Sequence, residues 1–139
     1  MLSILLVDDD LDEYDLFTTA LKQVTRDYAL NHVTECSDLF AVIKKVNPDL
    51  VFLDINMPGM NGIECLKSIR ADKKYQSLPI IIYSTSNNRI NIQEAYENNA
   101  NFYIVKPYSI QGIIKALEKI ISIDWQIEKR PSMNNFVIA

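Results

Sequence analysis

The sequence contains no apolar stretch that approaches the roughly 18 residues needed to cross a membrane as a helix. Residues 1–7 are apolar, but they lack the basic start of a signal peptide and run directly into Asp8, Asp9 and Asp10. We therefore expect neither a secretion signal nor a membrane partner, and we expect the protein to be located in the cytoplasm.

Basic residues are in the minority. The chain has 14 Lys and Arg residues against 18 Asp and Glu residues, which gives a net charge of −4. Proteins whose main role is to bind nucleic acid need clustered Lys and Arg side chains to contact the phosphates. The charge balance therefore argues against a nucleic-acid partner.

Cysteine and histidine are also scarce, with two Cys residues and one His residue. Cys36 and Cys65 lie far apart and lack the spacing of metal ligands, so we expect two buried or half-buried thiols in a reducing cytosol. We expect His32 on a weak second strand, far from the functional edge described below. It is predicted to be an ordinary surface residue rather than a phosphate donor.

The 139 residues suffice for one domain that buries about two thirds of its unfolded surface. Short apolar runs predict strands, and apolar residues spaced by three and four predict helices between them. The predicted strands are residues 4–7, 31–35, 50–54, 80–83 and 102–105, and the predicted helices lie near residues 16–24, 39–46, 63–69, 90–98 and 110–121. This alternation predicts an α/β fold with a doubly wound, five-stranded parallel sheet flanked by five helices.

Several helix ends carry local signals. Ser37 or Asp38 can cap the second helix, and the Asn-Pro-Asp sequence at residues 47–49 should stop it. Asn99 suits a left-handed cap after the fourth helix, because its short amide tolerates a positive φ.

The most informative stretch is residues 50–62, in which four apolar residues run directly into Asp54. An unbroken apolar run predicts a strand that is buried on both faces of a parallel sheet. Pro58, Gly59 and Gly62 predict the loop that leads away into the third helix. Because ligands bind at the carboxyl edge of an open α/β sheet, we expect Asp54 to be the central functional residue.

Polar groups lie at the ends of four of the predicted strands: Asp8 and Asp9 follow the first, Asp54 ends the third, Ser84 follows the fourth and Lys106 follows the fifth. The carboxyl ends of parallel strands meet at one edge of the sheet. Neighbouring carboxylates repel each other, and a magnesium ion (Mg²⁺), which prefers oxygen ligands, would relieve this repulsion. Asp54 could then attack phosphorus and form an acyl phosphate, while Lys106 and Ser84 balance the charge on the transferred group.

Each of these groups also has an ordinary structural interpretation. The two aspartates after the first strand could simply cap a helix, Ser84 could be a turn residue, and Lys106 could be a solvated charge. Asp10, Asp12 and Asp15 are best interpreted as solvated charges near a helix start. The combination of the four strand ends favours a site more strongly than any one of them.

These residues and their spacing resemble the receiver domains of two-component response regulators over residues 3–122. The resemblance is carried by residues 7–9, residues 53–62, Ser84 and residues 103–107. It implies a flavodoxin-like strand order, 2-1-3-4-5, and a phosphoprotein that works in signal transduction through a two-component system or phosphorelay. Asp54 would be the phosphoacceptor, supplied by a sensor histidine kinase or a histidine phosphotransfer protein.

The same resemblance implies a set of ligands for the metal. Asp9, the Asp54 carboxylate and the backbone carbonyl of Asn56 would hold Mg²⁺, and Asp8 would act through a water molecule. Lys106 would contact the phosphoryl group.

The resemblance further implies a switch made of Ser84 and Tyr103, which would change the face formed by the fourth helix, fifth strand and fifth helix. Tyr103 could instead be an ordinary half-buried strand residue. The Lys106–Pro107 peptide bond would be cis, a form that is nearly confined to proline. Thr85 departs from the smaller residue usual after the switch hydroxyl, which leaves the affinity for small phosphate donors open.

By this resemblance, residues 1–123 form the receiver (phosphoacceptor) domain, and residues 124–139 are a short tail rather than an output domain. Trp125 and Phe136 favour packing of the tail on the fifth helix or on a second subunit, with a mobile tail as the alternative. We expect a stand-alone receiver that signals to a downstream protein by contact, and a homodimer is left open.

Two other functions fit the residues less well. An aspartyl-phosphate hydrolase of the dehalogenase kind needs a second carboxylate two residues after the nucleophile, where this chain has Asn56. A flavodoxin-like cofactor binder needs a Gly- and Thr-rich phosphate loop after the first strand, and none follows it here. We therefore expect a signalling switch that catalyses only its own phosphorylation and dephosphorylation, and not a metabolic enzyme.

Overall fold

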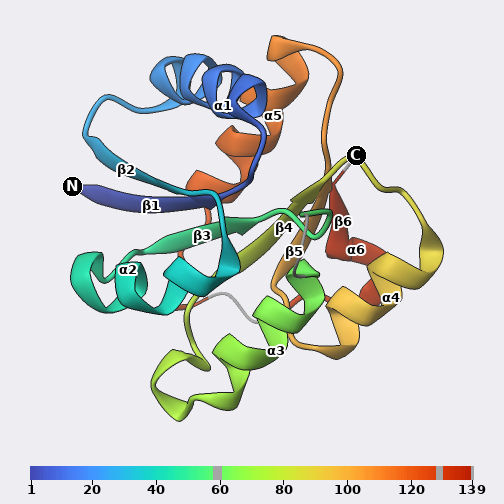
Figure 1. The fold of residues 1–139 in the computed structure, drawn as a ribbon. Helices are drawn as coiled ribbons and strands as arrows, with labels where there is room; N and C mark the ends of the chain where they lie inside the picture. Colours follow the sequence, from blue (N-terminus) through green and yellow to red (C-terminus); the bar gives the residue numbers. More distant parts are fainter. Residues whose placement is uncertain (58–60, 128–129, 139) are drawn as a thin grey trace.

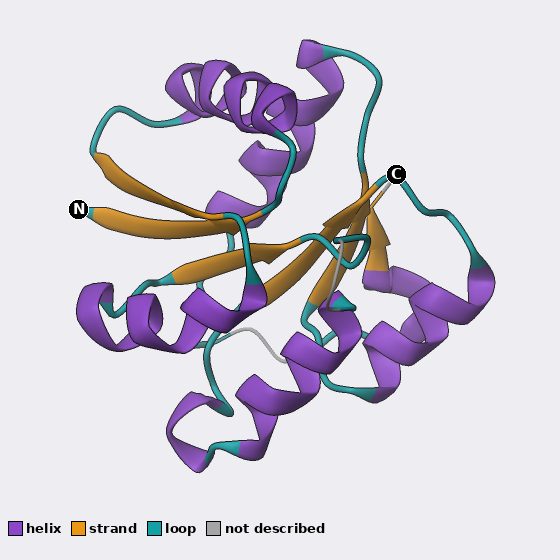
Figure 2. Ribbon diagram, in the orientation of Figure 1, coloured by secondary structure: helices purple, strands orange, loops and turns teal. Residues whose placement is uncertain are grey.

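The computed structural model describes residues 1–57, 61–127 and 130–138, which form a central sheet with helices on both faces (Figures 1 and 2). The strands pair in the order β2-β1-β3-β4-β5-β6, and every pair is parallel. Their bounds are β1 Leu2–Val7, β2 Tyr28–Val33, β3 Leu50–Leu53, β4 Ile80–Ser84, β5 Phe102–Val105 and β6 Val137–Ile138. The predicted doubly wound sheet is confirmed, and a short sixth strand extends it.

The helices are α1 Leu11–Val24, α2 Leu39–Val46, α3 Gly62–Ala71, α4 Arg89–Glu97, α5 Ile110–Ile121 and α6 Met133–Phe136, with 3₁₀ turns η1 Cys36–Asp38 and η2 Lys73–Tyr75. Helices α1 and α5 cover one face of the sheet, and α2, α3 and α4 cover the other (Figure 1). Within the described parts of the chain, no helix combines the length and the hydropathy needed to cross a membrane.

The two faces of the sheet bury alternate residues of the same strands. Leu6 and Phe52 pack in a cluster with residues of α1 and α5, whereas Leu5 and Val51 pack with residues of α2 and α3. Successive strand side chains point to opposite faces, so a strand with helices on both sides must be apolar throughout. This explains the unbroken apolar runs of β1, β3 and β4.

The helix ends agree in part with the sequence signals. Asn99 has φ 68°, as predicted, and Asn47 ends α2 in the same left-handed region with φ 48°. The predicted cap of α2 by Ser37 or Asp38 is wrong, because a 3₁₀ turn precedes the helix and no side chain caps it.

Strand β2 lies at one edge of the sheet, as predicted, but its bounds differ from the expected residues 31–35. It begins at Tyr28 and ends at Val33, and all six residues pair with β1. The missed start is Tyr28, Ala29 and Leu30. The polar residues Asn31 and His32 interrupt the apolar pattern, which is weak because an edge strand is only half buried.

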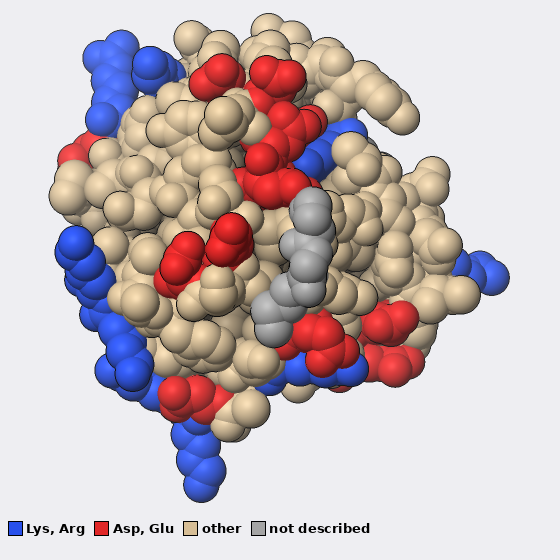
Figure 3. All heavy atoms as spheres, in the orientation of Figure 1, with Lys and Arg blue, Asp and Glu red and all other residues tan. Residues whose placement is uncertain are grey.

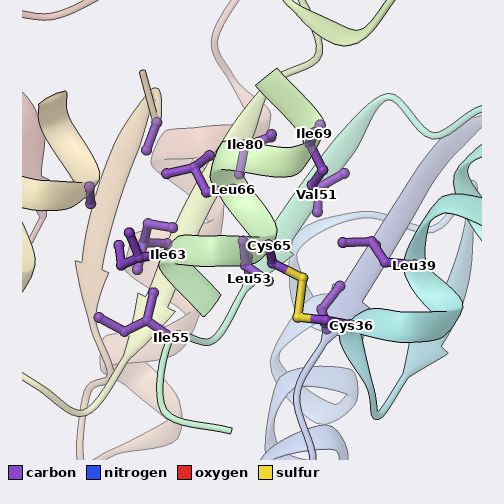
Figure 4. Close-up of a cluster of buried hydrophobic side chains, with 14 of the residues drawn as sticks. Cys36, Leu39, Val51, Leu53, Ile55, Ile63, Cys65, Leu66, Ile69 and Ile80 are labelled. Atoms are coloured by element: carbon purple, nitrogen blue, oxygen red, sulfur yellow. A yellow bond between two sulfur atoms is a disulfide. The ribbon is translucent and has the colours of Figure 1, made fainter. Parts of the chain in front are cut away.

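The prediction of two free thiols is wrong. Cys36 and Cys65 form a disulfide with Cα atoms 6.0 Å apart, as Figure 4 shows. Cys36 lies in η1 before α2, and Cys65 lies in α3, so both face the same side of the sheet. The two sulfur atoms are buried among the apolar side chains of that side, including Leu53 and Leu66.

The tail divides between the two faces of the sheet. Trp125 packs edge-on against Phe102 of β5, with 6.0 Å between ring centroids, in the cluster that also holds residues of α5. Phe136 instead lies in the opposite cluster and is fully buried. The tail then adds β6 to the free edge of β5, with Val137 opposite Tyr103, a pairing that the sequence did not predict.

Candidate functional site

Four polar side chains are buried at the carboxyl ends of the central strands: Asp8, Asp54, Ser84 and Lys106. Backbone hydrogen bonds hold these ends in line. The Asp54 amide donates to the Val7 carbonyl at 2.9 Å, and the Lys106 amide donates to the Ser84 carbonyl at 2.7 Å. The parallel pairing therefore brings the four predicted groups to one edge of the sheet.

Lys106 lies between two of the carboxylates. Its Nζ is 2.8 Å from Oδ2 of Asp8 and 3.4 Å from Oδ2 of Asp54. The same ammonium group lies 5.4 Å from the ring centroid of the buried Tyr83. Lys106 is therefore a fixed cation at the Asp54 carboxylate rather than a solvated charge.

Asp9 adds a third, exposed carboxylate to this group. Ligand oxygens of Asp8, Asp9 and Asp54 all lie within 4.8 Å of one another. Three carboxylates against one ammonium leave an excess of negative charge, which a hard divalent cation would balance. Figure 3 shows acidic side chains gathered on this face of the molecule, while Lys and Arg lie mainly around its margin.

Burial sets the protonation properties of the site. Removal from water raises the pKa of Asp54 above its ordinary value, against the opposing effects of the Asn56 amide and the Lys106 charge. Burial alone would lower the pKa of Lys106, but its hydrogen bond to Asp8 and the nearby carboxylates raise it overall. Lys106 therefore stays charged at neutral pH.

Glu13 of α1 also belongs to the electrostatic surroundings of the site, although the sequence did not single it out. Burial raises its pKa, and the charges of Lys106 and Asp8 act on it as well. Its position in the first turn of α1, just after Asp8 and Asp9, is the sequence signal for this role.

Asn56 contacts the site in two ways. Its backbone amide donates to Oδ1 of Asp54 at 3.0 Å, and its side-chain Nδ2 donates to Oγ of Ser84 at 3.2 Å. The sequence placed only its backbone carbonyl near a metal, and the side-chain contact was missed. Asn56 is only two residues from Asp54, so the sequence indicated that it lies near the site. It did not indicate that the side-chain amide points toward Ser84.

Ser84 connects this group to the loop after β4. Its Oγ also accepts a hydrogen bond from the Ser86 amide at 3.2 Å. The Ser86 carbonyl in turn accepts a hydrogen bond from the Tyr103 hydroxyl at 2.7 Å. Tyr103 is fully buried, so the two predicted switch residues are linked through Ser86.

The placement predicted for His32 is wrong. Its Nε2 lies 2.7 Å from the carbonyl oxygen of Asp8, and its ring stacks on Tyr14 with centroids 4.5 Å apart. The parallel register places His32 opposite Leu6, near the carboxyl end of β2 and therefore at the functional edge. The error arose because the strand was expected to run to residue 35.

The Lys106–Pro107 bond is trans, which corrects the cis bond implied by the resemblance; the described residues contain no cis peptide. The trans form is the more stable one for proline by roughly 0.5–1 kcal/mol. Pro58 and Gly59, predicted to form the loop after Asp54, lie outside the described residues.

Residues 4–118 match the family described as response regulator receiver domain. The chain is 36% identical over 113 residues to the chemotaxis protein CheY-3 of Vibrio cholerae serotype O1, a match that covers 79% of this chain and 87% of that protein.

Two solved structures share the fold over nearly the whole chain. The Mn²⁺-bound form of response regulator Rcp1 has a TM-score of 0.78 at 25% identity and covers 95% of this chain and 100% of that one. The phosphorylated cyanobacterial phytochrome response regulator RcpA has a TM-score of 0.79 at 26% identity and covers 94% of this chain and 98% of that one.

Proposed function

The chain belongs to the response regulator receiver domain family, and from this membership we propose that it accepts a phosphoryl group on Asp54. The observation that supports this most strongly is the environment of the carboxylate. Asp54 lies at a strand end with one oxygen 3.0 Å from the Asn56 amide and the other 3.4 Å from the Lys106 ammonium. These contacts orient the carboxylate. Asp8 makes a similar pair of contacts, with the Asp10 amide at 3.0 Å and Lys106 at 2.8 Å, but Asp8 is fully buried whereas Asp54 keeps 5% of its surface exposed.

The proposed reaction is an in-line displacement at phosphorus. One Asp54 oxygen forms a bond to phosphorus while the bond from phosphorus to the imidazole nitrogen of a phosphohistidine breaks. That nitrogen keeps the electron pair, and the product is an acyl phosphate on Asp54. Lys106 balances part of the charge of the transferred group.

The carboxylates fit a magnesium ion. Asp9, Asp54 and the backbone carbonyl of Asn56 would hold it, with Asp8 acting through water, and the spacing of the carboxylate oxygens within 4.8 Å supports this set. When bound, the ion supplies positive charge that neutralises the reacting oxygens. The Mn²⁺-bound and phosphorylated states named for the two similar structures are consistent with this proposal.

We further propose that Ser84 and Tyr103 transmit the change. The Ser84 hydroxyl would turn toward the new phosphoryl group, and Tyr103 would respond through Ser86. The altered face would be that of α4, β5 and α5, where a downstream protein would bind.

The proposed partners and domain division follow the same family. The donor would be a sensor histidine kinase or a histidine phosphotransfer protein. Residues 1–123 would act as the receiver, with residues 124–139 as a short tail. Asn56 offers a carboxamide where a hydrolase of the dehalogenase kind needs an acid, which favours a switch over such an enzyme.

Phosphoryl transfer from a phosphorylated histidine kinase tests the proposal. We expect radiolabel to move from the kinase to the wild-type protein in the presence of Mg²⁺, and not to the Asp54→Asn variant. The matched control is Asp15→Asn, which removes an exposed carboxylate of α1 and should leave the transfer unchanged. Wild-type labelling of Asp54→Asn would refute the assignment.

A further inference from the structure

The last described segment of the chain, residues 130–138, occupies the surface formed by α4 and β5; we call this segment the C-terminal clasp. Strand β6 pairs in parallel with the free edge of β5, with Val137 opposite Tyr103 and Ile138 opposite Ile104. Figure 1 shows α6 and β6 beside β5 and α4, far from the start of the tail after α5. The clasp therefore covers part of the face through which a receiver is proposed to signal.

Phe136 anchors the clasp. Its side chain is fully buried, and its ring meets the ring of Tyr96 edge-on with centroids 5.1 Å apart. The centroid of the Tyr103 ring lies 6.3 Å from that of Phe136. A buried aromatic side chain that contacts other aromatic rings is a common anchor of a bound peptide segment.

Arg130 secures the start of the clasp. Its guanidinium lies 3.9 Å from the ring centroid of Tyr96, and it donates hydrogen bonds to the carbonyls of Ala100 and Tyr96. The Tyr96 hydroxyl donates to the Pro131 carbonyl at 3.3 Å. The clasp is therefore held on α4 and β5 in three ways: by strand pairing, by the buried ring of Phe136 and by the hydrogen bonds of Arg130. These are the contacts by which an added peptide strand binds to a sheet edge.

A continuous chain of contacts joins this surface to Asp54. Asn56 bonds both Asp54 and Ser84, Ser84 accepts from Ser86, and Ser86 accepts from Tyr103. Tyr103 lies against Phe136 and pairs with Val137 in the sheet. A movement of Ser84 toward Asp54 would draw its Oγ away from the Ser86 amide and break that hydrogen bond. Ser86, whose carbonyl accepts from the Tyr103 hydroxyl, would then be held less firmly.

We propose that the C-terminal clasp is an intramolecular ligand of the α4–β5 surface and that phosphorylation of Asp54 releases it. This inference rests on the proposed function. Release uncovers the edge of β5 and the pocket of Phe136, so the surface then fits a partner that offers an extended segment with an aromatic residue. By reciprocity, a docked clasp weakens binding at Asp54, and loss of the clasp strengthens it.

Hydrogen exchange of the full-length protein tests the docking without any phosphorylation. We expect the amides of residues 133–138 to be protected in the wild type. Phe136→Ala should raise their exchange by at least about tenfold, because it removes a fully buried ring. Ile127→Ala, a change of a 77% exposed tail residue, is the control and should leave the protection intact. Unprotected amides in the wild type would overturn the proposal.

Beryllofluoride with Mg²⁺, which mimics the phosphoryl group, tests the coupling. We expect it to raise exchange in residues 133–138 of the wild type, and to bind Phe136→Ala several-fold more tightly than wild type or Ile127→Ala. Binding with equal affinity to all three proteins would overturn the coupling alone. Failure to bind any of them would contradict the proposed function, and the coupling with it.

Dilution separates an intramolecular clasp from an exchange of tails between two copies. Protection of residues 133–138 should be independent of protein concentration, with a monomer in sedimentation. Protection that disappears on dilution together with a dimer would assign the surface to the tail of a second copy and overturn the intramolecular proposal.

Discussion

Asp54 shares its buried surroundings with the carboxylate of Asp8 and with one ammonium group, that of Lys106. Because burial raises the pKa of Asp54, the native state favours its protonated form more than the unfolded state does. The ionised carboxylate therefore lowers the free energy of unfolding at neutral pH. The buried carboxylate that is proposed to receive the phosphoryl group thus lowers the stability of the unphosphorylated protein.

Asp54→Asn should accordingly raise the free energy of unfolding at neutral pH, because it replaces a buried carboxylate whose ionised form is disfavoured by burial with a neutral group. The gain is full above the raised pKa of the folded state and disappears as the pH falls below the ordinary value of 3.8. Thermal unfolding across this range, without Mg²⁺, measures it, with Asp15→Asn as the control. A variant less stable than wild type at neutral pH would contradict the electrostatic account.

Lys106→Ala should leave two carboxylates buried without their cation. We expect a loss of roughly 3 kcal/mol in the free energy of unfolding, because unpaired buried charges are costly. Its raised pKa means that this loss is present throughout the neutral range and fades only as the pH rises through that pKa.

The same variant should also uncouple the switch. Mg²⁺ binding should stay largely intact, while beryllofluoride should no longer produce the wild-type change in the amide spectrum. Lys115→Ala, at an exposed position of α5, is the matched control. A wild-type spectral change in Lys106→Ala would remove the coupling role.

At the residue scale, the sequence predicted which groups meet because each of them directly follows an apolar strand. Asp8, Asp54, Ser84 and Lys106 needed only the parallel order of the strands to come together. The amide contact of Asn56 with Ser84 was not predictable, since it depends on a side-chain rotamer. The contact of His32 with Asp8 depends on the register of β2, which its weak apolar pattern concealed.

At the scale of elements, α3 begins against the end of β3. A Cβ on Gly62 would lie 2.3 Å from the Asp54 carbonyl oxygen and 2.4 Å from the Ile55 Cα atom, both of which are backbone atoms. Only glycine allows the helix to start so close to the strand that carries the phosphoacceptor.

Gly62→Ala should therefore push α3 away from β3 and lower the free energy of unfolding by about 1–3 kcal/mol. We expect weaker Mg²⁺ binding as well, because Asp54 and Asn56 would shift with the backbone. Denaturant unfolding and Mg²⁺ titration measure both effects. Ser68→Ala, at an exposed position of the same helix, should change neither; unchanged values for Gly62→Ala would contradict this packing.

Elements that carry a strong apolar pattern were predictable, and those held by tertiary contacts alone were not. The unbroken apolar runs of β1, β3, β4 and β5 predict that these strands are buried. The long stripe of apolar residues along α5 predicts which side of that helix packs on the sheet. Strand β6 has only two residues and no period of its own. It forms because the edge of β5 offers unpaired backbone groups and because Phe136 has a pocket to fill.

At the scale of the whole molecule, the disulfide ties α3 to the turn before α2, a link across 29 residues of sequence. Such a link restricts the unfolded chain far more than the folded one. For a loop of this length the chain-entropy relation gives about 3–4 kcal/mol of stabilisation. Spacing alone could not predict the pair, since only the shared face of α2 and α3 brings the two cysteines together.

Reduction of the disulfide should therefore lower the free energy of unfolding by about 3–4 kcal/mol while leaving the labelling of Asp54 intact. Denaturant unfolding with and without reductant measures this loss. The double variant Cys36→Ser, Cys65→Ser is the control, and it should be insensitive to reductant. Two titratable thiols in the folded protein before reduction would contradict the link.

The covalent site of phosphorylation is the most direct test of the central claim. The full-length protein is incubated with acetyl phosphate and Mg²⁺, the acyl phosphate is reduced to an alcohol with borohydride, and the peptides are sequenced by mass spectrometry. We predict that Asp54 alone is modified, only with Mg²⁺, and not in Asp54→Asn. An unmodified Asp54 with phosphate on another side chain would contradict the account.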